Sequence, residues 1–197
     1  MSSQSREDEQ RDRAAGAKRK YEQRERAAKQ EATRRRIAAA TAELHAEVGP
    51  ARTTIAEIAK RAGVQRPTVY NNFPSEKELL AACQAHFLAT SPPPPLDPAN
   101  GLERVLTELY GWWRANEQMS GNVARDRGAL PALDELMRET ADAQFDALAE
   151  ALGSDRASRA YVRVALTFQT WQTLARRGLS DRAAARLMAT SAPASCR

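Results

Sequence analysis

Residues 53–80 read TTIAEIAKRAGVQRPTVYNNFPSEKELL, and this stretch decides the fold. Thr54 and Glu57 have the spacing of a capping box, in which a hydroxyl and a carboxylate satisfy each other's exposed backbone N–H groups at a helix start. Gly63 permits the positive φ of a tight turn, and Pro67 suits the first turn of a following helix. The stretch therefore predicts two short helices joined by a glycine turn.

A longer helix is expected on each side of this pair. Apolar residues at helical spacing predict a helix over about 33–48, which Gly49-Pro50 ends. Behind the pair, Ser75 and Glu78 form a second capping-box spacing and open a helix that ends before Pro92.

The remaining residues have helical rather than strand-like patterning. Residues 92–95 are prolines and predict an extended spacer. Apolar stripes after it predict helices at about 102–114, 130–152, 156–176 and 180–189. We therefore expect an all-α chain with roughly nine helices.

Composition excludes several classes of protein. The chain has 197 residues, of which 42% are apolar, and can bury a core without disulfides or a metal. Its two cysteines, Cys83 and Cys196, have no partner pattern, so we expect a reducing cytoplasmic location. No apolar run approaches the ~18 residues of a membrane span, and we expect neither a membrane protein nor a secreted one.

The net charge of +5 lies entirely in the N-terminal arm. Residues 1–36 hold 12 Lys/Arg and 7 Asp/Glu, whereas the remaining 18 basic and 18 acidic residues cancel. A basic arm on a neutral body indicates a polyanionic partner, reached through phosphate or minor-groove contacts. The alternative is a solvated tail. With no apolar stripe, the arm is expected to be disordered when free, with helical tendency near its end.

Residues 53–80 predict a helix, a glycine turn and a second helix with an exposed polar face. Such an arrangement presents side chains to the major groove of DNA. The residues also resemble a known family. Thr53 to Ala59, Ala62 to Val64, Thr68 to Phe73 and Ser75 to Leu80 are similar to the DNA-binding half of the TetR/AcrR repressors. The resemblance covers about residues 33–88. It implies a three-helix DNA-binding head, a connecting fourth helix, and a C-terminal helical bundle that dimerises and holds a small-molecule pocket.

The resemblance also implies site residues, position by position. Tyr70 matches a phosphate-contacting tyrosine, although its ring could instead belong to the core, and Thr54 would reach a phosphate from the start of its helix. Two amides beside a tyrosine on an exposed face suit base edges and phosphates. The expected core positions are Val64, Val69 and Phe73. The predicted DNA-binding residues are Thr54, Arg66, Thr68, Tyr70, Asn71, Asn72 and Lys77.

Three positions depart from the family pattern. Glu76 stands where a lysine is usual, and the positive charge is displaced to Lys77, so either residue could face the DNA backbone. Gln65 replaces the usual serine cap. His45 stands where the first helix usually buries an aromatic residue.

The aromatic residues of the second half gather mainly on two predicted helices, 102–114 and 156–176, which also carry all three tryptophans. A plain core explains this spacing, and so does a pocket lined by rigid rings with a few polar groups such as Thr167, Gln169 and Thr170. The predicted effector-binding residues are Tyr110, Trp112, Trp113, Phe145, Tyr161, Phe168 and Trp171. They favour a neutral or weakly charged, hydrophobic and aromatic effector.

The charged residues near these stripes carry weaker expectations. Asp134, Glu139 and Asp142 could attract a cationic ligand, but they lie mostly off the apolar stripe and are expected in solvent. Arg163 could pair an anionic group or point to water. Because the apolar residues of 161–174 fall on two sides of one helix, a second subunit is expected to cover one of them.

No enzymatic chemistry is predicted. The sequence has no Gly-rich phosphate loop after a strand and no Gly-x-Ser-x-Gly elbow, and Cys83 is expected on an apolar helix side without a histidine partner. His45 and His86 have no ligand partners at suitable spacing, so neither a metal nor a cofactor is expected.

The predicted domains are a basic, disordered N-terminal arm (1–30), a helix-turn-helix DNA-binding domain (31–76), a helical effector-binding and dimerisation domain (77–190), and a flexible tail (191–197). The predicted function is a TetR-like, ligand-responsive regulator, most simply a repressor, that binds a palindromic double-stranded DNA operator as a homodimer. Two alternatives stay open, a nonspecific or architectural DNA-binding protein, and a helical ligand carrier or interaction domain without DNA use.

Overall fold

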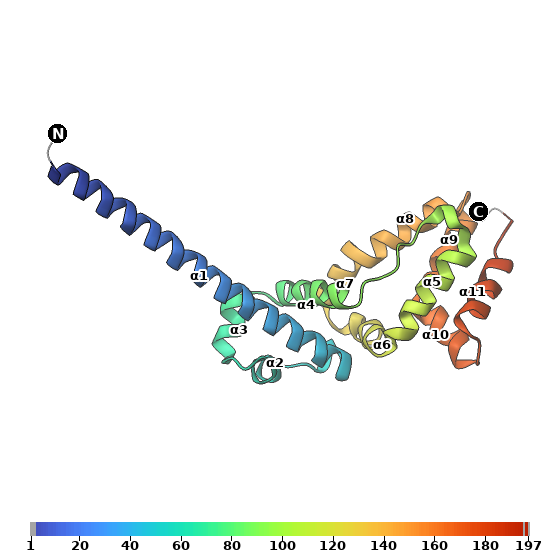
Figure 1. The fold of residues 1–197 in the computed structure, drawn as a ribbon. Helices are drawn as coiled ribbons and strands as arrows, with labels where there is room; N and C mark the ends of the chain where they lie inside the picture. Colours follow the sequence, from blue (N-terminus) through green and yellow to red (C-terminus); the bar gives the residue numbers. More distant parts are fainter. Residues whose placement is uncertain (1–2, 195, 197) are drawn as a thin grey trace.

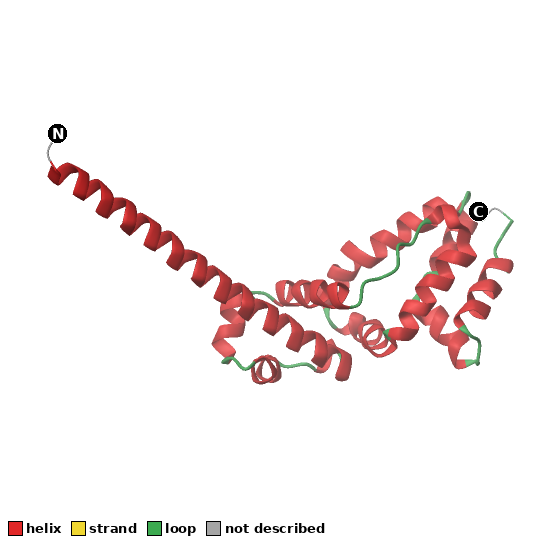
Figure 2. Ribbon diagram, viewed as in Figure 1, coloured by secondary structure: helices red, strands yellow, loops and turns green. Residues whose placement is uncertain are grey.

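The structure is a computed structural model that describes residues 3–194 and residue 196, with side chains from Lys20 onward. The expectations for residues 1–2, 195 and 197, at the ends of the predicted arm and tail, lie outside the described residues. Helices joined by loops make up the described chain (Figure 2), and its sole β feature is an isolated bridge between Gly153 and Cys196. The all-α prediction is confirmed. The bridge holds the predicted flexible tail at Cys196.

Three helices form the head. α1 (Ser3–Glu47) lies over α2 (Ile55–Ala62) and α3 (Arg66–Asn72), and a 3-10 turn (Pro50–Arg52) leads from α1 to α2. Thr54 and Glu57 form the predicted capping box, and Gly63 has the predicted left-handed backbone with φ 64°. The core of the head contains the following buried residues: Ile37, Ala40, Leu44, Ile58, Ala59, Ala62, Val69, Phe73 and Leu79.

α1 corrects the prediction of a disordered arm and of a first helix beginning near residue 33. It is continuous from Ser3 and projects far beyond the head (Figure 1). The stretch contains no proline and is rich in Ala, Arg, Lys, Glu and Gln, the residues of highest helix propensity. Helical propensity therefore outweighed the missing apolar stripe.

α4 (Glu76–Thr90) connects the head to the bundle, because it packs against α1 on one side and α7 on the other. Ser75 caps its start by accepting a hydrogen bond from the Glu78 N–H at 3.2 Å. An extended segment then leads to a 3-10 turn (Pro98–Asn100), which the Asp97 carboxylate caps.

The bundle contains the remaining helices: α5 (Gly101–Ala115), α6 (Glu117–Asp126), α7 (Pro131–Met137), α8 (Ala143–Leu152), α9 (Arg156–Ala165), α10 (Phe168–Arg176) and α11 (Asp181–Thr190). A 3-10 turn (Arg127–Ala129) precedes α7, and a π-helical turn (Arg138–Asp142) joins α7 to α8. The core centres on α5, whose Val105, Leu106 and Tyr110 are fully buried.

Three features of the bundle differ from the sequence predictions. The first is α6, for which the sequence predicted no helix. The π-helical turn interrupts the helix expected at 130–152, and Leu166 and Thr167 divide the helix expected at 156–176. The Thr167 hydroxyl caps the new start by accepting from the Thr170 N–H at 3.3 Å, which is why the chain can bend there.

The head is held on the bundle at the C-terminal end of α1, where backbone carbonyls have no partner inside the helix. The Asn122 side chain, on α6, donates hydrogen bonds to the carbonyls of His45 at 2.9 Å and Ala46 at 2.7 Å. Arg125 donates to the carbonyl of Val48 at 2.9 Å. We call this contact between the end of α1 and α6 the α1–α6 joint.

Asp126 completes the joint from the same helix. Its carboxylate accepts from the Ala51 N–H at 3.0 Å and from the Arg125 guanidinium at 2.6 Å. Gly49 lies beneath this ion pair with φ 98° and ψ 157°, a backbone region that essentially only glycine adopts. A Cβ added at Gly49 would overlap the side chains of Arg125 and Asp126.

We expect Gly49→Ala to lower the free energy of unfolding by at least ~2 kcal/mol, because it adds backbone strain and displaces the joint. The matched control is Gly63→Ala, also at positive φ but with open space around its Cβ, which we expect to cost about 1 kcal/mol. Urea unfolding of both variants checks this. Equal losses would show that the joint imposes no constraint on residue 49.

Candidate functional site

α3 presents a polar face to solvent. The Arg66 and Asn71 side chains are exposed, and the Tyr70 ring is 51% exposed. A tyrosine in the core would be covered, so the core alternative for Tyr70 is excluded. Thr68 is half-buried on the same helix, and Thr54 is exposed at the start of α2, where its hydroxyl serves the capping box.

Asn72 corrects the predicted site, because it is only 8% exposed and turns into the head. Its side-chain amide donates to the Thr68 carbonyl at 2.8 Å, and its buried Oδ1 has no hydrogen-bond partner among the described residues. The backbone carbonyl of Asn72 accepts from Arg34, whose guanidinium also lies 4.3 Å from the centroid of the Phe73 ring. Val69 and Phe73 are buried as expected, and Val64 packs against the same core.

Lys77 also lies elsewhere than expected. Its amino group is 2.9 Å from a carboxylate oxygen of Glu135 and 3.0 Å from one of Glu139, so it faces the bundle rather than continuing the face of α3. These two carboxylates raise the pKa of Lys77. The neighbouring Glu76 is exposed. Lys77 therefore ties α4 to α7 and the π-helical turn.

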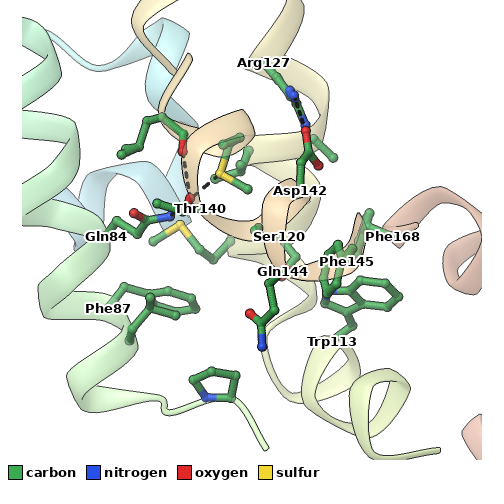
Figure 3. Close-up of a pocket in the computed structure, with 18 of the residues that line it drawn as sticks. Gln84, Phe87, Trp113, Ser120, Arg127, Thr140, Asp142, Gln144, Phe145 and Phe168 are labelled. Atoms are coloured by element: carbon green, nitrogen blue, oxygen red, sulfur yellow. Dashed lines mark hydrogen bonds and ion pairs between the residues drawn. The ribbon is translucent and has the colours of Figure 1, made fainter. Parts of the chain in front are cut away.

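A cavity of about 430 Å³ lies between α4 and the helices α5 to α10. Figure 3 shows its aromatic wall beside Trp113, Phe145 and Phe168, with Phe87 across the space. Four predicted effector-binding residues line it: Trp112, Trp113, Phe145 and Phe168. Of the polar residues expected with them, Thr167 and Gln169 line it and Thr170 does not.

The other three predicted effector-binding residues do not line this cavity. Tyr110 is fully buried and its hydroxyl donates to the Ala165 carbonyl at 2.8 Å. The Tyr161 hydroxyl donates to the Met188 carbonyl at 2.7 Å, and the Trp171 indole N–H to Asp181 at 2.9 Å. These three rings hold the bundle together.

Trp113 joins the cavity wall to that buried aromatic core. Its ring stacks on Tyr110 with centroids 5.7 Å apart, and it meets Phe145 and Phe168 edge to face at 6.3 and 5.8 Å. Such contacts fix aromatic rings in preferred geometries. The cavity wall is therefore rigid at this position.

The polar part of the cavity wall was largely missed by sequence reasoning. Asp142 lines the cavity between two arginines, 2.6 Å from Arg127 and 2.8 Å from Arg163. Burial raises the pKa of Asp142, but the two guanidiniums outweigh burial, so the pKa of this carboxyl lies below its usual value. The prediction of a solvated Asp142 is wrong. Arg163 pairs with protein carboxylates rather than pointing to water.

The π-helical turn explains the error about Asp142. Its i→i+5 hydrogen bonding inserts an extra residue into the turn and rotates the following side chains relative to an α-helix. An α-helical projection of residues 130–152 therefore misplaces Asp142. Thr140, in the same turn, also lines the cavity and accepts a hydrogen bond from Gln84 at 3.0 Å. Ser120 and Gln144 add two further polar groups (Figure 3).

His45 and Cys83 form a buried pair at the edge of the cavity, which corrects the expectation that Cys83 has no histidine nearby. The Cys83 Sγ lies 3.4 Å from the His45 Nδ1. Burial raises the pKa of the Cys83 thiol to about 12, and burial lowers the pKa of His45 to about 4, against a smaller opposing effect of Asp126. Both groups are neutral near pH 7, so the pair has no thiolate for nucleophilic chemistry.

The pair predicts a pH-dependent stability. His45 is protonated below pH 6.5 when unfolded but only near pH 4 when folded, so the unfolded state gains protons as the pH falls. From pH 7 to pH 5 we expect a loss of about 2 kcal/mol in unfolding free energy from this group. In His45→Phe, which keeps an aromatic ring in the site, this loss should be absent, whereas His86→Gln should behave as wild type. Urea unfolding at the two pH values decides; a His45→Phe variant that keeps the wild-type pH dependence would contradict the assignment.

The described residues contain no group of His, Cys, Asp and Glu suited to a metal ion. None of the helices that these residues form has the length and apolar character needed to cross a membrane.

Comparison with known proteins places the head in a family. Residues 37–83 match the family model "Bacterial regulatory proteins, tetR family". The uncharacterized HTH-type transcriptional regulator Mb2274c of Mycobacterium bovis is 43% identical over 63 residues, which are 32% of this chain and 33% of the relative. Rv2250c of Mycobacterium tuberculosis, of the same description, is 43% identical over 54 residues, 27% of this chain and 29% of the relative. The match thus spans about a third of these curated relatives.

Two solved structures share the fold over most of the chain. A transcriptional regulator from Rhodococcus sp. Rha1 has a TM-score of 0.58 at 19% identity, covering 83% of this chain and 97% of that one. The multidrug binding protein EbrR, complexed with imidazole, has a TM-score of 0.56 at 22% identity, covering 81% of this chain and 94% of that one. The predicted resemblance is confirmed. The match places residues 37–83 in a TetR-type helix-turn-helix domain, and the two solved structures share the helical fold of most of the chain.

Proposed function

We propose that this chain is a ligand-responsive transcriptional regulator that binds an inverted-repeat operator as a homodimer. The observation that carries the proposal is the exposed face of α3, where Arg66, Tyr70 and Asn71 stand together on a short helix. A guanidinium and an amide suit base edges in the major groove, and a phenol suits a phosphate. Thr54 and the half-buried Thr68 flank these residues. Asn72 and Lys77 are not part of the proposed surface.

The proposed effector is a small hydrophobic molecule, neutral overall and aromatic. The cavity offers the rings of Trp113, Phe145 and Phe168 for stacking. The charged groups in the cavity wall already form ion pairs, since Asp142 lies between Arg127 and Arg163. A neutral polar group on the ligand can hydrogen-bond there without separating these charges, whereas a bare charge would disrupt the pairing. The multidrug binding neighbour EbrR supports a ligand-binding role for this fold.

α6 is the proposed route from effector to DNA. This helix lines the cavity with Met119, Ser120 and Val123. It also donates hydrogen bonds to carbonyls at the end of α1, from Asn122 and Arg125. A ligand that shifts α6 therefore shifts the head. Release of DNA then follows from a population shift, and a tenfold preference of the ligand for one head position corresponds to about 1.4 kcal/mol.

The homodimer rests on different residues from those expected. The two sets of apolar residues expected on opposite sides of 161–174 are buried or half-buried within one chain, with Val162 and Trp171 fully buried, so the argument from these residues fails. Val164 on α9 and Leu187 on α11 are instead 55% and 44% exposed. A second copy of the chain could cover these side chains and place two α3 helices on one duplex.

Selection of bound sequences from random DNA tests the proposed operator. We expect inverted repeats with half-sites about one helical turn apart or somewhat more. Tyr70→Phe should weaken binding to every sequence by roughly 1 kcal/mol, whereas Arg66→Ala should cost about 1–3 kcal/mol and relax the preferred bases. Tyr161→Phe, which alters a hydroxyl inside the bundle, is the control.

The selection also separates the alternative functions. A bound pool without palindromes favours a nonspecific or architectural DNA-binding protein. No bound pool at all, from a folded protein that takes up ligands, favours a carrier or interaction domain.

Tryptophan fluorescence tests the cavity. We expect compounds that release DNA to quench wild-type fluorescence, and Trp113→Phe to weaken their binding by about tenfold, because a ring at the cavity wall is lost. Trp171→Phe is the matched control, since this ring lies outside the cavity, and it should bind as wild type. Equal responses of the two variants would place the effector elsewhere.

A further inference from the structure

Beyond the head, α1 continues as a helix that projects away from the rest of the described chain (Figure 1). Between residues 20 and 36, every side chain is exposed except those of Glu22, Thr33 and Arg34, which are half-buried. Tyr21, the aromatic residue of this stretch, is 63% exposed. The projecting helix therefore has no apolar stripe with which to join a coiled coil or a protein core.

The spacing of charged residues explains how this segment can be helical without packing against other elements. Five glutamates each precede a basic residue by four positions, the favourable order for a helical ion pair: Glu7–Arg11, Glu9–Arg13, Glu22–Arg26, Glu25–Lys29 and Glu31–Arg35. In the last of these pairs the charged groups are 3.6 Å apart. Each such pair adds only a few tenths of a kcal/mol, so an additional partner would stabilise the helix further.

The remaining charge is strongly positive. Residues 11–36 hold 11 Lys/Arg and 4 Asp/Glu, a balance of +7. Lys20, Arg24 and Arg36 have no acidic residue three or four positions away, and all three side chains are exposed. These three side chains carry charge that the helix itself does not neutralise.

The projecting helix leaves the head beside the end of α3. Arg34 joins the two, because its guanidinium donates to the Asn72 carbonyl and lies over the Phe73 ring. From residue 36 back to residue 3 the helix extends for roughly 50 Å, about the length of 15 base pairs of duplex. DNA held by α3 would thus lie within reach of its basic side chains.

We propose that the projecting segment of α1, residues 11–36, is a second DNA-binding element that contacts phosphates of the duplex flanking the half-site held by α3. The inference rests on the proposed operator binding and deepens it. Charge complementarity and the position of the helix beside the end of α3 identify DNA as the partner. An acidic protein would match the charge but would find no apolar contact on this helix.

The test compares two duplexes, the palindrome selected in the operator experiment and the same palindrome extended by 15 base pairs on each side. We expect the full chain to bind the extended duplex about tenfold more tightly. The triple variant Lys20→Gln, Arg24→Gln, Arg36→Gln should lose this gain, and its dependence of log affinity on log salt should flatten by roughly 0.9 per lost phosphate contact.

A matched control removes the same charge from the bundle. Arg104, Arg156 and Arg177 are exposed there, and replacing all three by Gln should leave the gain from the flanks unchanged. Circular dichroism verifies that both variants fold. If both triple variants lost the affinity gain from the flanks equally, net charge alone would explain that gain, and the proposal would be overturned.

Equal affinity of the wild type for both duplexes, with an unchanged salt slope in the triple variant, also overturns the proposal. The operator function is judged separately, from discrimination between the short palindrome and a scrambled duplex of equal length. A chain that discriminates but gains nothing from the flanks retains the proposed function and loses this inference.

Discussion

The end of α1 imposes the constraint on which the rest of the structure depends. A helix that stops inside a protein leaves backbone carbonyls without partners, and their burial is costly unless other groups donate to them. Asn122 and Arg125 supply these donors from α6, at 2.7 to 2.9 Å. The same contacts fix the position of the head on the bundle. The hydrogen bonds that satisfy the end of α1 therefore also set how the head and the bundle are oriented.

The cavity lies directly behind this joint. Met119 and Val123 of α6 line the cavity and also pack in one apolar cluster with Ala42 and Ala46 of α1. Asn122, on the same helix, donates hydrogen bonds to the end of α1. Because packed interiors transmit strain rather than absorb it, the proposed effector would act on the head through this one helix. The buried His45–Cys83 pair lies between α1 and α4, and the lowered pKa of His45 makes the stability of this region depend on pH.

α1 links three regions in one continuous helix. Its C-terminal end meets the bundle, its middle forms the core of the head through Ile37 and Leu44, and its N-terminal part projects beyond α3. The middle and the C-terminal end are stabilised by apolar packing, the end through Ala42 and Ala46. The projecting part relies on helix propensity and ion-pair spacing. Positive charge is therefore concentrated where the chain buries least.

The sequence by itself determined the head, because capping residues, a glycine turn and apolar periodicity are local signals, and Thr54, Gly63 and Ser75 act as expected. It also singled out Trp113, Phe145 and Phe168 as candidate ligand-binding rings, and all three line the cavity. Only the tertiary structure decided which rings line the cavity and which, like Trp171, are core, because both kinds share one periodicity. It alone turned Asn72 inward, paired Lys77 with Glu135, and brought Asp142 to the cavity through a π-helical turn. These outcomes depend on contacts between residues distant in the chain, and no local pattern encodes such contacts.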